Sequence, residues 1–98
     1  MPIRERNQPD PSHDRARERA ETMALLMVQF LLAEDERTDG LFDTTGLSPD
    51  DLRSGLTDAA FLGGVMDYLL SREDLLIVFC EEQNIDPTMP LRIRQVLP

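Results

Sequence analysis

The phrase Leu47–Leu52, which reads Leu-Ser-Pro-Asp-Asp-Leu, returns at Leu70–Leu75 as Leu-Ser-Arg-Glu-Asp-Leu. In each copy the serine can accept a hydrogen bond from a backbone N–H that the first turn of a helix leaves unpaired. The Asp three residues later can reach back to the backbone as in a capping box, and the two leucines have the spacing of a hydrophobic staple. The two phrases therefore predict helices that begin at Ser48 and at Ser71.

The longest apolar stretch precedes these phrases and runs over Met23–Ala33, interrupted only by Gln29. Apolar residues at three- and four-residue spacing predict one long helix that begins at Ser12 or Asp14 and ends near Glu36. Its second half adds apolar residues on another face: Leu25, Val28 and Leu32. Such a helix either lies at the centre of a bundle or places one face on a second chain. We expect the central place.

Similar signals divide the rest of the chain into five further helical elements. Their expected starts are Thr38, Ser48, Thr57 or Asp58, Ser71, and the neighbourhood of Pro90. Their expected ends are Gly46, Gly55, the residue before Ser71, Asn84 and Leu97. Taken alone, Leu75–Cys80 could form a buried strand, but the cap before it and the acidic residues after it favour a helix.

Two adjacent glycines, Gly63 and Gly64, fall inside the fourth expected helix. Each costs about 1 kcal/mol of helix stability relative to Ala. They either let another helix approach closely or leave room for a partner, and we favour the first explanation.

The sequence thus predicts an all-α protein, a compact bundle of five or six helices with the long first helix central and short capped helices around it. Prolines at three of the first eleven positions predict a mobile tail over residues 1–12, followed by a single helical domain over residues 13–98. The expected core is Met27, Phe30, Leu31, Leu52, Phe61, Val65, Leu69, Leu76, Phe79 and Cys80.

The charge of the chain is unevenly distributed. There are 19 acidic and ten basic residues, every basic residue is Arg, and the formal net charge is −9. Residues 1–20 carry a net charge of +1, residues 21–91 carry −12, and residues 92–98 carry +2. An acidic body repels nucleic acid phosphates, so we expect no nucleic acid partner. The same surface suits a basic patch on a partner protein, or serves solubility alone.

The single cysteine excludes an internal disulfide framework. No signal peptide is visible at the start of the sequence, and the longest apolar stretch is too short to cross a bilayer. We therefore expect a cytoplasmic protein with no membrane partner.

Familiar chemical motifs are incomplete. A calcium loop over Asp35–Gly46 would have Arg37 and Gly46 where it needs an oxygen ligand and a bidentate Glu. An acyl carrier needs an exposed Ser preceded by Asp, whereas Ser48 and Ser71 each follow a leucine. A DNA-reading helix needs basic or amide side chains, and Thr57–Leu70 contains none.

Nucleophilic catalysis also lacks its parts. The only histidine, His13, lies at the edge of the expected tail, and Cys80 lies in an expected core segment, where a thiol is inert. We therefore expect no enzyme, and no catalytic, cofactor-binding or metal-binding residue.

Several of these stretches, taken in order, resemble a family of small uncharacterised alphaproteobacterial proteins of about this length. They are Gly46–Arg53, Phe61–Gly63, Asp67–Leu70, Phe79–Cys80 and Asp86–Pro87, and the resemblance covers residues 21–97. The family has no established active site. Its genes often lie beside that of a cell-cycle response regulator, so the resemblance implies a signalling protein as partner.

Our leading hypothesis is a non-enzymatic protein-interaction or regulatory adapter module, with a protein as its partner. One alternative is a structural homo-oligomer, a homodimer for example, which the apolar second half of the first helix would support. The other is a small-molecule binder or enzyme with a pocket near Gly63 and Gly64.

Overall fold

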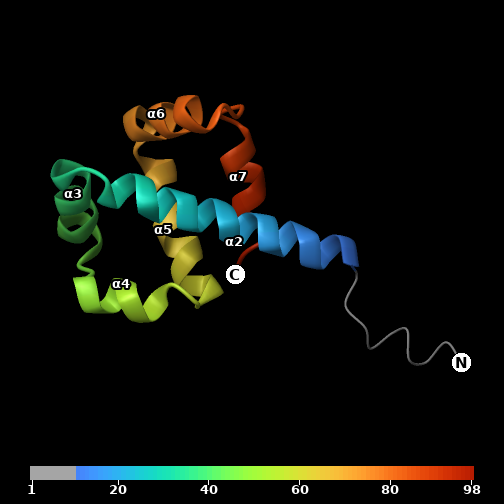
Figure 1. Ribbon diagram of the computed structural model, residues 1–98, viewed down its shortest axis with the longest axis horizontal. Helices are drawn as coiled ribbons and strands as arrows, with labels where there is room; N and C mark the ends of the chain where they lie inside the picture. The colour runs from blue at the N-terminus through green and yellow to red at the C-terminus, as the bar shows by residue number, and fades with distance from the viewer. Residues whose placement is uncertain (1–10) are drawn as a thin grey trace, which may run out of the picture.

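The computed structural model describes residues 11–98, with side chains from Asp14 onward. Over that range it consists of six helices and no strand (Figure 1). They are α2 (Pro11–Leu32), α3 (Asp35–Thr45), α4 (Pro49–Gly55), α5 (Ala59–Ser71), α6 (Glu73–Gln83) and α7 (Met89–Arg94). The expected all-α bundle is confirmed. Residues 1–10 of the expected tail lie outside the described residues, whereas its last two residues form the start of α2.

The first helix ends earlier than the sequence predicts, at Leu32 instead of near Glu36. Side chains of α3 donate hydrogen bonds to the last carbonyl groups of α2. The Thr38 hydroxyl donates to the carbonyl of Leu31 at 2.9 Å, and Arg37 donates to the carbonyl of Phe30 at 3.2 Å. Thr38 therefore lies within α3 and does not cap it, contrary to the prediction. No glycine or proline marks this corner, because these side-chain bonds supply the stop.

The predicted end of α3 and start of α4 are confirmed. Gly46 adopts a left-handed conformation, with φ of 76°, and its N–H donates to the carbonyl of Phe42 at 2.8 Å. Ser48 then forms a complete capping box with Asp51: the serine hydroxyl accepts from the Asp51 N–H at 3.1 Å, and the Asp51 carboxylate accepts from the Ser48 N–H at 3.0 Å. Pro49 occupies the first turn, as expected.

The prediction for the second copy of the phrase is wrong. Ser71 is the last residue of α5, and its hydroxyl donates to the carbonyl of Tyr68 at 2.6 Å. Helix α6 begins only after Arg72, whose side chain makes no capping bond. The difference lies in the residue after each serine. Pro49 forces Ser48 into an extended conformation, which a capping residue needs, whereas Arg72 leaves Ser71 free to continue the preceding helix.

The remaining boundaries follow the sequence closely. Asp58 caps α5 by accepting from the Ala60 N–H at 3.0 Å. Asn84 ends α6 in the left-handed conformation, and the Ile85 N–H donates to the carbonyl of Cys80 at 3.0 Å. The segment Leu75–Cys80 is helical, and α7 ends at Arg94, three residues before the predicted Leu97.

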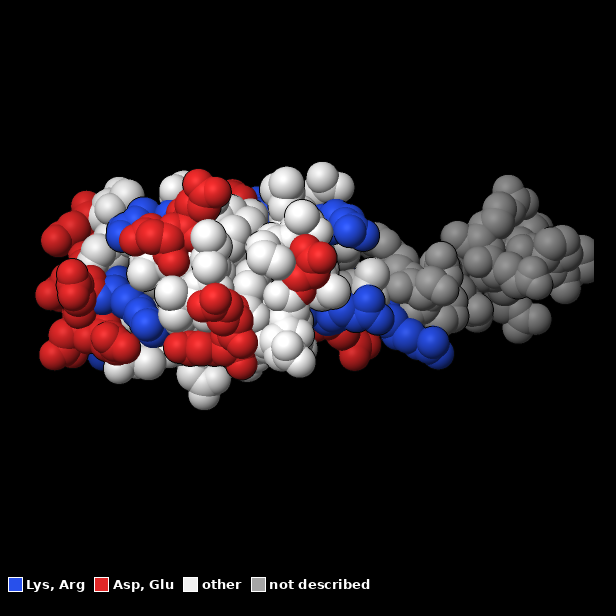
Figure 2. All heavy atoms as spheres, turned by 90° about the horizontal axis from the view of Figure 1, so that it is seen from above, with Lys and Arg blue, Asp and Glu red and all other residues white. Residues whose placement is uncertain are grey.

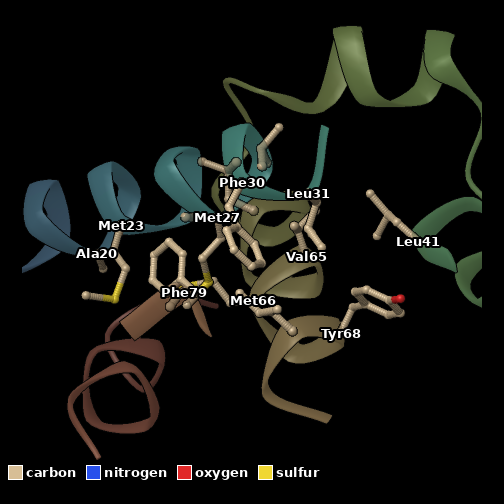
Figure 3. Packing of buried hydrophobic residues seen from close by; sticks show 14 of the residues in the cluster. Ala20, Met23, Met27, Phe30, Leu31, Leu41, Val65, Met66, Tyr68 and Phe79 are labelled. Carbon is tan, nitrogen blue, oxygen red and sulfur yellow. The ribbon is translucent and has the colours of Figure 1, made fainter. Parts of the chain in front are cut away.

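The long helix takes the central place that was predicted. Helix α2 packs against α3, α5 and α7, and it crosses the picture between α6 and α7 on one side and α4 on the other (Figure 1). Eight of the ten expected core residues are buried, whereas Phe61 and Leu76 are half-buried and pack against the core. At its centre Phe30 of α2 meets Phe79 of α6 edge to face, with ring centroids 5.5 Å apart (Figure 3).

The C-terminal helix is held by an ion pair that the sequence does not predict. Arg94 of α7 forms two hydrogen bonds with the Asp67 carboxylate of α5, at 2.7 and 3.1 Å, and donates to the carbonyl of Leu97 at 2.9 Å. Gly63 makes this approach feasible. A Cβ atom there would lie 3.0 Å from the guanidinium carbon of Arg94 and from the carbonyl oxygen of Pro98.

The two serines offer a matched test of the capping assignment. Ser48→Ala should lower the free energy of unfolding by about 1 kcal/mol, because it leaves the Asp51 N–H without its partner. Ser71→Ala should change it by less than about 0.5 kcal/mol, since Ser71 is exposed and water can replace its hydroxyl at the Tyr68 carbonyl, one of the last carbonyls of α5. Urea denaturation measures both, and equal losses would contradict the assignment.

The adjacent glycines provide a second matched pair. Gly64→Ala should raise the free energy of unfolding by up to about 1 kcal/mol, because open space surrounds this position and Ala is the better helix former. Gly63→Ala should bring no such gain, because its methyl group would displace Arg94 from Asp67. Thermal unfolding compares the two variants, and an equal rise in Tm would show that Gly63 has no role in the approach of α7.

Candidate functional site

Helix α2 has two apolar faces, and the rest of the domain covers only one of them. The covered face includes Ala20, Ala24, Met27 and Leu31, which have no exposed surface. Figure 3 shows Met27 beside Phe30 and Phe79 in the cluster that joins α2 to α5 and α6. The other face carries Leu25 and Leu32, each 43% exposed. These two leucines are seven residues apart and so lie on one side of the helix, about 10 Å from each other along its axis.

The exposed face forms one wall of an open apolar groove of about 370 Å³. Its lining residues are Thr22, Leu25, Leu26, Val28, Gln29, Leu32 and Leu56. A smaller hollow of about 270 Å³ shares Leu25 and Leu56 with the groove and extends it to Glu21, Thr57 and Leu62. We call these two hollows together the α2 groove.

The second wall of the α2 groove is the corner between α4 and α5, where Leu56 lies. The corner is closed by a hydrogen bond from the Asp58 N–H to the carbonyl of Gly55, at 2.9 Å. It is packed by the ring of Phe61, which lies against Gly55 so closely that a Cβ atom at Gly55 would overlap it. Gly55 therefore ends α4 at its predicted place, but the close approach of the Phe61 ring is what requires a glycine there.

Both walls of the α2 groove are acidic in sequence and lack basic residues. Residues 21–36 contain four acidic residues and no basic residue, and residues 54–62, which contribute Leu56, Thr57 and Leu62, contain one acidic residue and no basic residue. Glu21, which lines the smaller hollow, has only a weak, exposed ion pair with Arg17, at 3.9 Å. The groove is therefore an apolar surface in a negative electrostatic environment.

A separate polar cleft of about 180 Å³ lies where the α2–α3 corner meets the α5–α6 corner, and it contains two arginines. Arg37 lies 3.9 Å above the ring of Phe30 and pairs with Glu34 at 3.4 Å. Arg72 donates to the Tyr68 hydroxyl at 3.2 Å and forms two hydrogen bonds with Asp74, each 3.3 Å long. Hydrogen bonding to Asp74 raises the pKa of Arg72, and the same contact lowers the pKa of Asp74. Both guanidinium groups thus bind acceptors of the protein itself. This is typical of arginines that hold two helix corners together.

The other candidate reactive groups are not brought together. Cys80 is buried, and its burial raises the pKa of its thiol. Asp86 accepts from the Thr88 N–H and hydroxyl, both at 2.8 Å, and these bonds lower its pKa. The part of the chain from residue 14 onward contains no group of three or more metal-ligating side chains. The side chain of His13 lies outside the described residues.

The pocket considered near Gly63 and Gly64 is not formed by the two glycines together. Gly63 is buried against Arg94 and the backbone of Pro98, whereas Gly64 is exposed with nothing within 4 Å of a Cβ placed there. The segment considered as a calcium loop forms helix α3 instead.

Charge is distributed along the long axis of the molecule (Figure 2). Acidic groups gather at the end where α3 lies (Figures 1 and 2), and the α2–α3 corner and α3 carry the exposed residues Glu34, Asp35, Glu36 and Asp39. Basic groups are seen near the other end, where α2 begins, and the first half of α2 carries the exposed residues Arg15, Arg17 and Arg19. Between the two ends Figure 2 shows mostly uncharged residues, with several acidic groups among them. Exposed apolar side chains away from the α2 groove are Ile77, Met89 and Leu91.

The family described as "Protein of unknown function (DUF3572)" matches residues 17–98. The chain belongs to this family. The matched region includes both walls of the α2 groove. The match confirms the expectation that the chain belongs to a family of unknown function. The searches of curated proteins and of solved structures found no match. Among the helices of residues 11–98, none has both the length and the apolar character that a membrane span requires.

The state of Cys80 can be tested directly. The thiol should not react with a thiol reagent at neutral pH in the folded protein, because it is 1% exposed and its pKa is raised by burial. Reaction should follow unfolding, so the labelled fraction in increasing urea should coincide with the loss of helical circular dichroism. Rapid labelling of the folded protein would contradict the buried position and reopen the question of a reactive cysteine.

Proposed function

We propose that this protein is a non-enzymatic protein-interaction module whose partner binds the α2 groove. The observation that carries the proposal is the exposure of Leu25 and Leu32 on a helix whose opposite face forms the core. A domain of 98 residues has few apolar side chains to spare for its surface. Apolar side chains placed together in a groove, instead of singly, are characteristic of interaction sites.

The disposition of the ionisable groups also supports a binding role. No Asp, Glu or Arg side chain of the described residues is buried, and no polar side-chain atom is buried without a hydrogen-bond partner. Catalysis depends on ionisable groups whose pKa values are shifted by a cleft and which face one another. Among the described residues, the hydrogen-bonded arginines and carboxylates instead hold helix ends and helix contacts in place, apart from the exposed pair of Arg53 and Asp50 within α4.

In the finer form of this proposal, the protein is a regulatory adapter and the partner is a signalling protein. The acidic groove disfavours nucleic acid and anionic membrane surfaces as partners, because both present phosphate groups. The structural homo-oligomer is the second candidate, and the same uncovered face of α2 supports it. Light scattering at micromolar concentration separates the two, since a strict monomer excludes the oligomer.

A double substitution in the groove tests the proposal. Leu25→Gln with Leu32→Gln should lower the free energy of unfolding by less than about 2 kcal/mol, because both side chains are already 43% exposed. The variant should fail to retain a protein that the wild-type chain retains from an extract of its native cell, with the bound proteins quantified by mass spectrometry.

The matched control is Ile77→Gln with Leu91→Gln, which removes two similarly exposed apolar side chains from another surface. The control should retain the partner as the wild type does. Retention of the same protein by the groove variant, or loss by both variants, would contradict the proposal.

A further inference from the structure

We infer that the occupant of the α2 groove is the apolar face of an amphipathic helix of another protein, with lysines or arginines along the edges of that face. This inference rests on the proposed function and specifies the partner's chemistry. Three properties of the groove support it: the spacing of its leucines, the sign of the charges around it, and the small apolar area it offers to a second copy of this chain.

The spacing of the exposed leucines fits a helix as ligand. Leu25 and Leu32 lie two turns apart on a single straight wall, and Leu56 faces that wall from the α4–α5 corner. A helix that lies along such a groove presents side chains at positions i, i+3, i+4 and i+7, which repeat over the same distance. Addition of a strand is not favoured, because the described part of the chain has no sheet edge to which a strand could pair.

The charges favour a basic partner. The two stretches that contribute the lining residues, residues 21–36 and 54–62, together contain five acidic residues and no basic one. At one end lies Glu21, and just past Leu32 follow Glu34, Asp35 and Glu36, all exposed except the half-buried Glu21. Of these, Glu34 pairs with Arg37 and Glu21 pairs weakly with Arg17, so part of the negative charge is already balanced. The remainder would attract lysine or arginine side chains at the edges of a bound helix.

A second copy of this chain is a poorer occupant. The two groove leucines are each 43% exposed, so together they expose less than one whole leucine residue. A stable dimer buries about 800 Å² on each partner. Pairing two α2 grooves would also bring two acidic surfaces together, and the formal charge of each chain is −9.

The inference is tested with synthetic helical peptides and the full chain. The probe is a peptide of about 18 residues, five helical turns, with leucines on one face and lysines along its edges. A second peptide carries glutamates in place of the lysines, and a third has the composition of the first but a central proline that prevents a continuous helix. Affinities are measured by isothermal titration calorimetry for the wild type, the Leu25→Gln/Leu32→Gln variant and the Ile77→Gln/Leu91→Gln control.

The wild type and the control should bind the lysine peptide with the same affinity, and the groove variant should bind it about tenfold more weakly. The glutamate and proline peptides should also bind at least about tenfold more weakly than the lysine peptide at low salt. The preference for lysine over glutamate should shrink as salt is added.

Equal binding of the lysine peptide by the groove variant, equal affinity for the glutamate peptide, or no binding at all would overturn the inference. So would a dimer of the chain alone that the groove substitutions dissociate, because a second copy would then occupy the site. A different outcome is that a native partner is retained through Leu25 and Leu32 while the lysine peptide is not preferred. The proposed function would then stand, and only the inference that the partner presents a basic helix would be wrong.

Discussion

The structure depends on how Phe30 is held where α2 meets the rest of the domain. Its ring meets the edge of Phe79 at an interplanar angle of 76°, and Arg37 covers one of its faces at 3.9 Å. Arg37 also donates to the carbonyl of Phe30, so one side chain both packs on the core and ends the helix. This arrangement fixes which face of α2 turns inward. Leu25 and Leu32, on the opposite face, are consequently left to the surface.

Helix α2 contributes both to the hydrophobic core and to the α2 groove. The inward face of α2 supplies Met27, Phe30 and Leu31 to the core, and the outward face supplies one wall of the α2 groove. The second wall is formed by the α4–α5 corner, where Gly55 packs against the ring of Phe61 and Asp58 caps α5. The residues that stabilise the fold and those that we propose for binding are therefore neighbours on the same helix. Their separation is set by the helical period, which places consecutive residues about 100° apart.

Local signals in the sequence predict most of the fold, and their failures have physical causes. Ser48 caps a helix as expected, because Pro49 fixes the backbone beside it, whereas the near-identical phrase at Ser71 lacks that constraint. The end of α2 at Leu32 could not be predicted, because it depends on hydrogen bonds from Arg37 and Thr38 across a corner. One wall of the α2 groove could be predicted, because the sequence places Leu25 and Leu32 on a second apolar face of the long helix. The wall at Leu56 was not visible, because it depends on tertiary packing.

If α2 has one face that folding requires and another that stays free, the adjacent residues Leu31 and Leu32 should differ in their effect on stability. Leu31 has no exposed surface, whereas Leu32 is 43% exposed. The measurement is the free energy of unfolding of the two single alanine variants in urea. We expect a loss of about 2–5 kcal/mol for Leu31→Ala and of less than about 1 kcal/mol for Leu32→Ala. Losses of similar size would mean that folding needs both faces of α2, and that α2 has no free face.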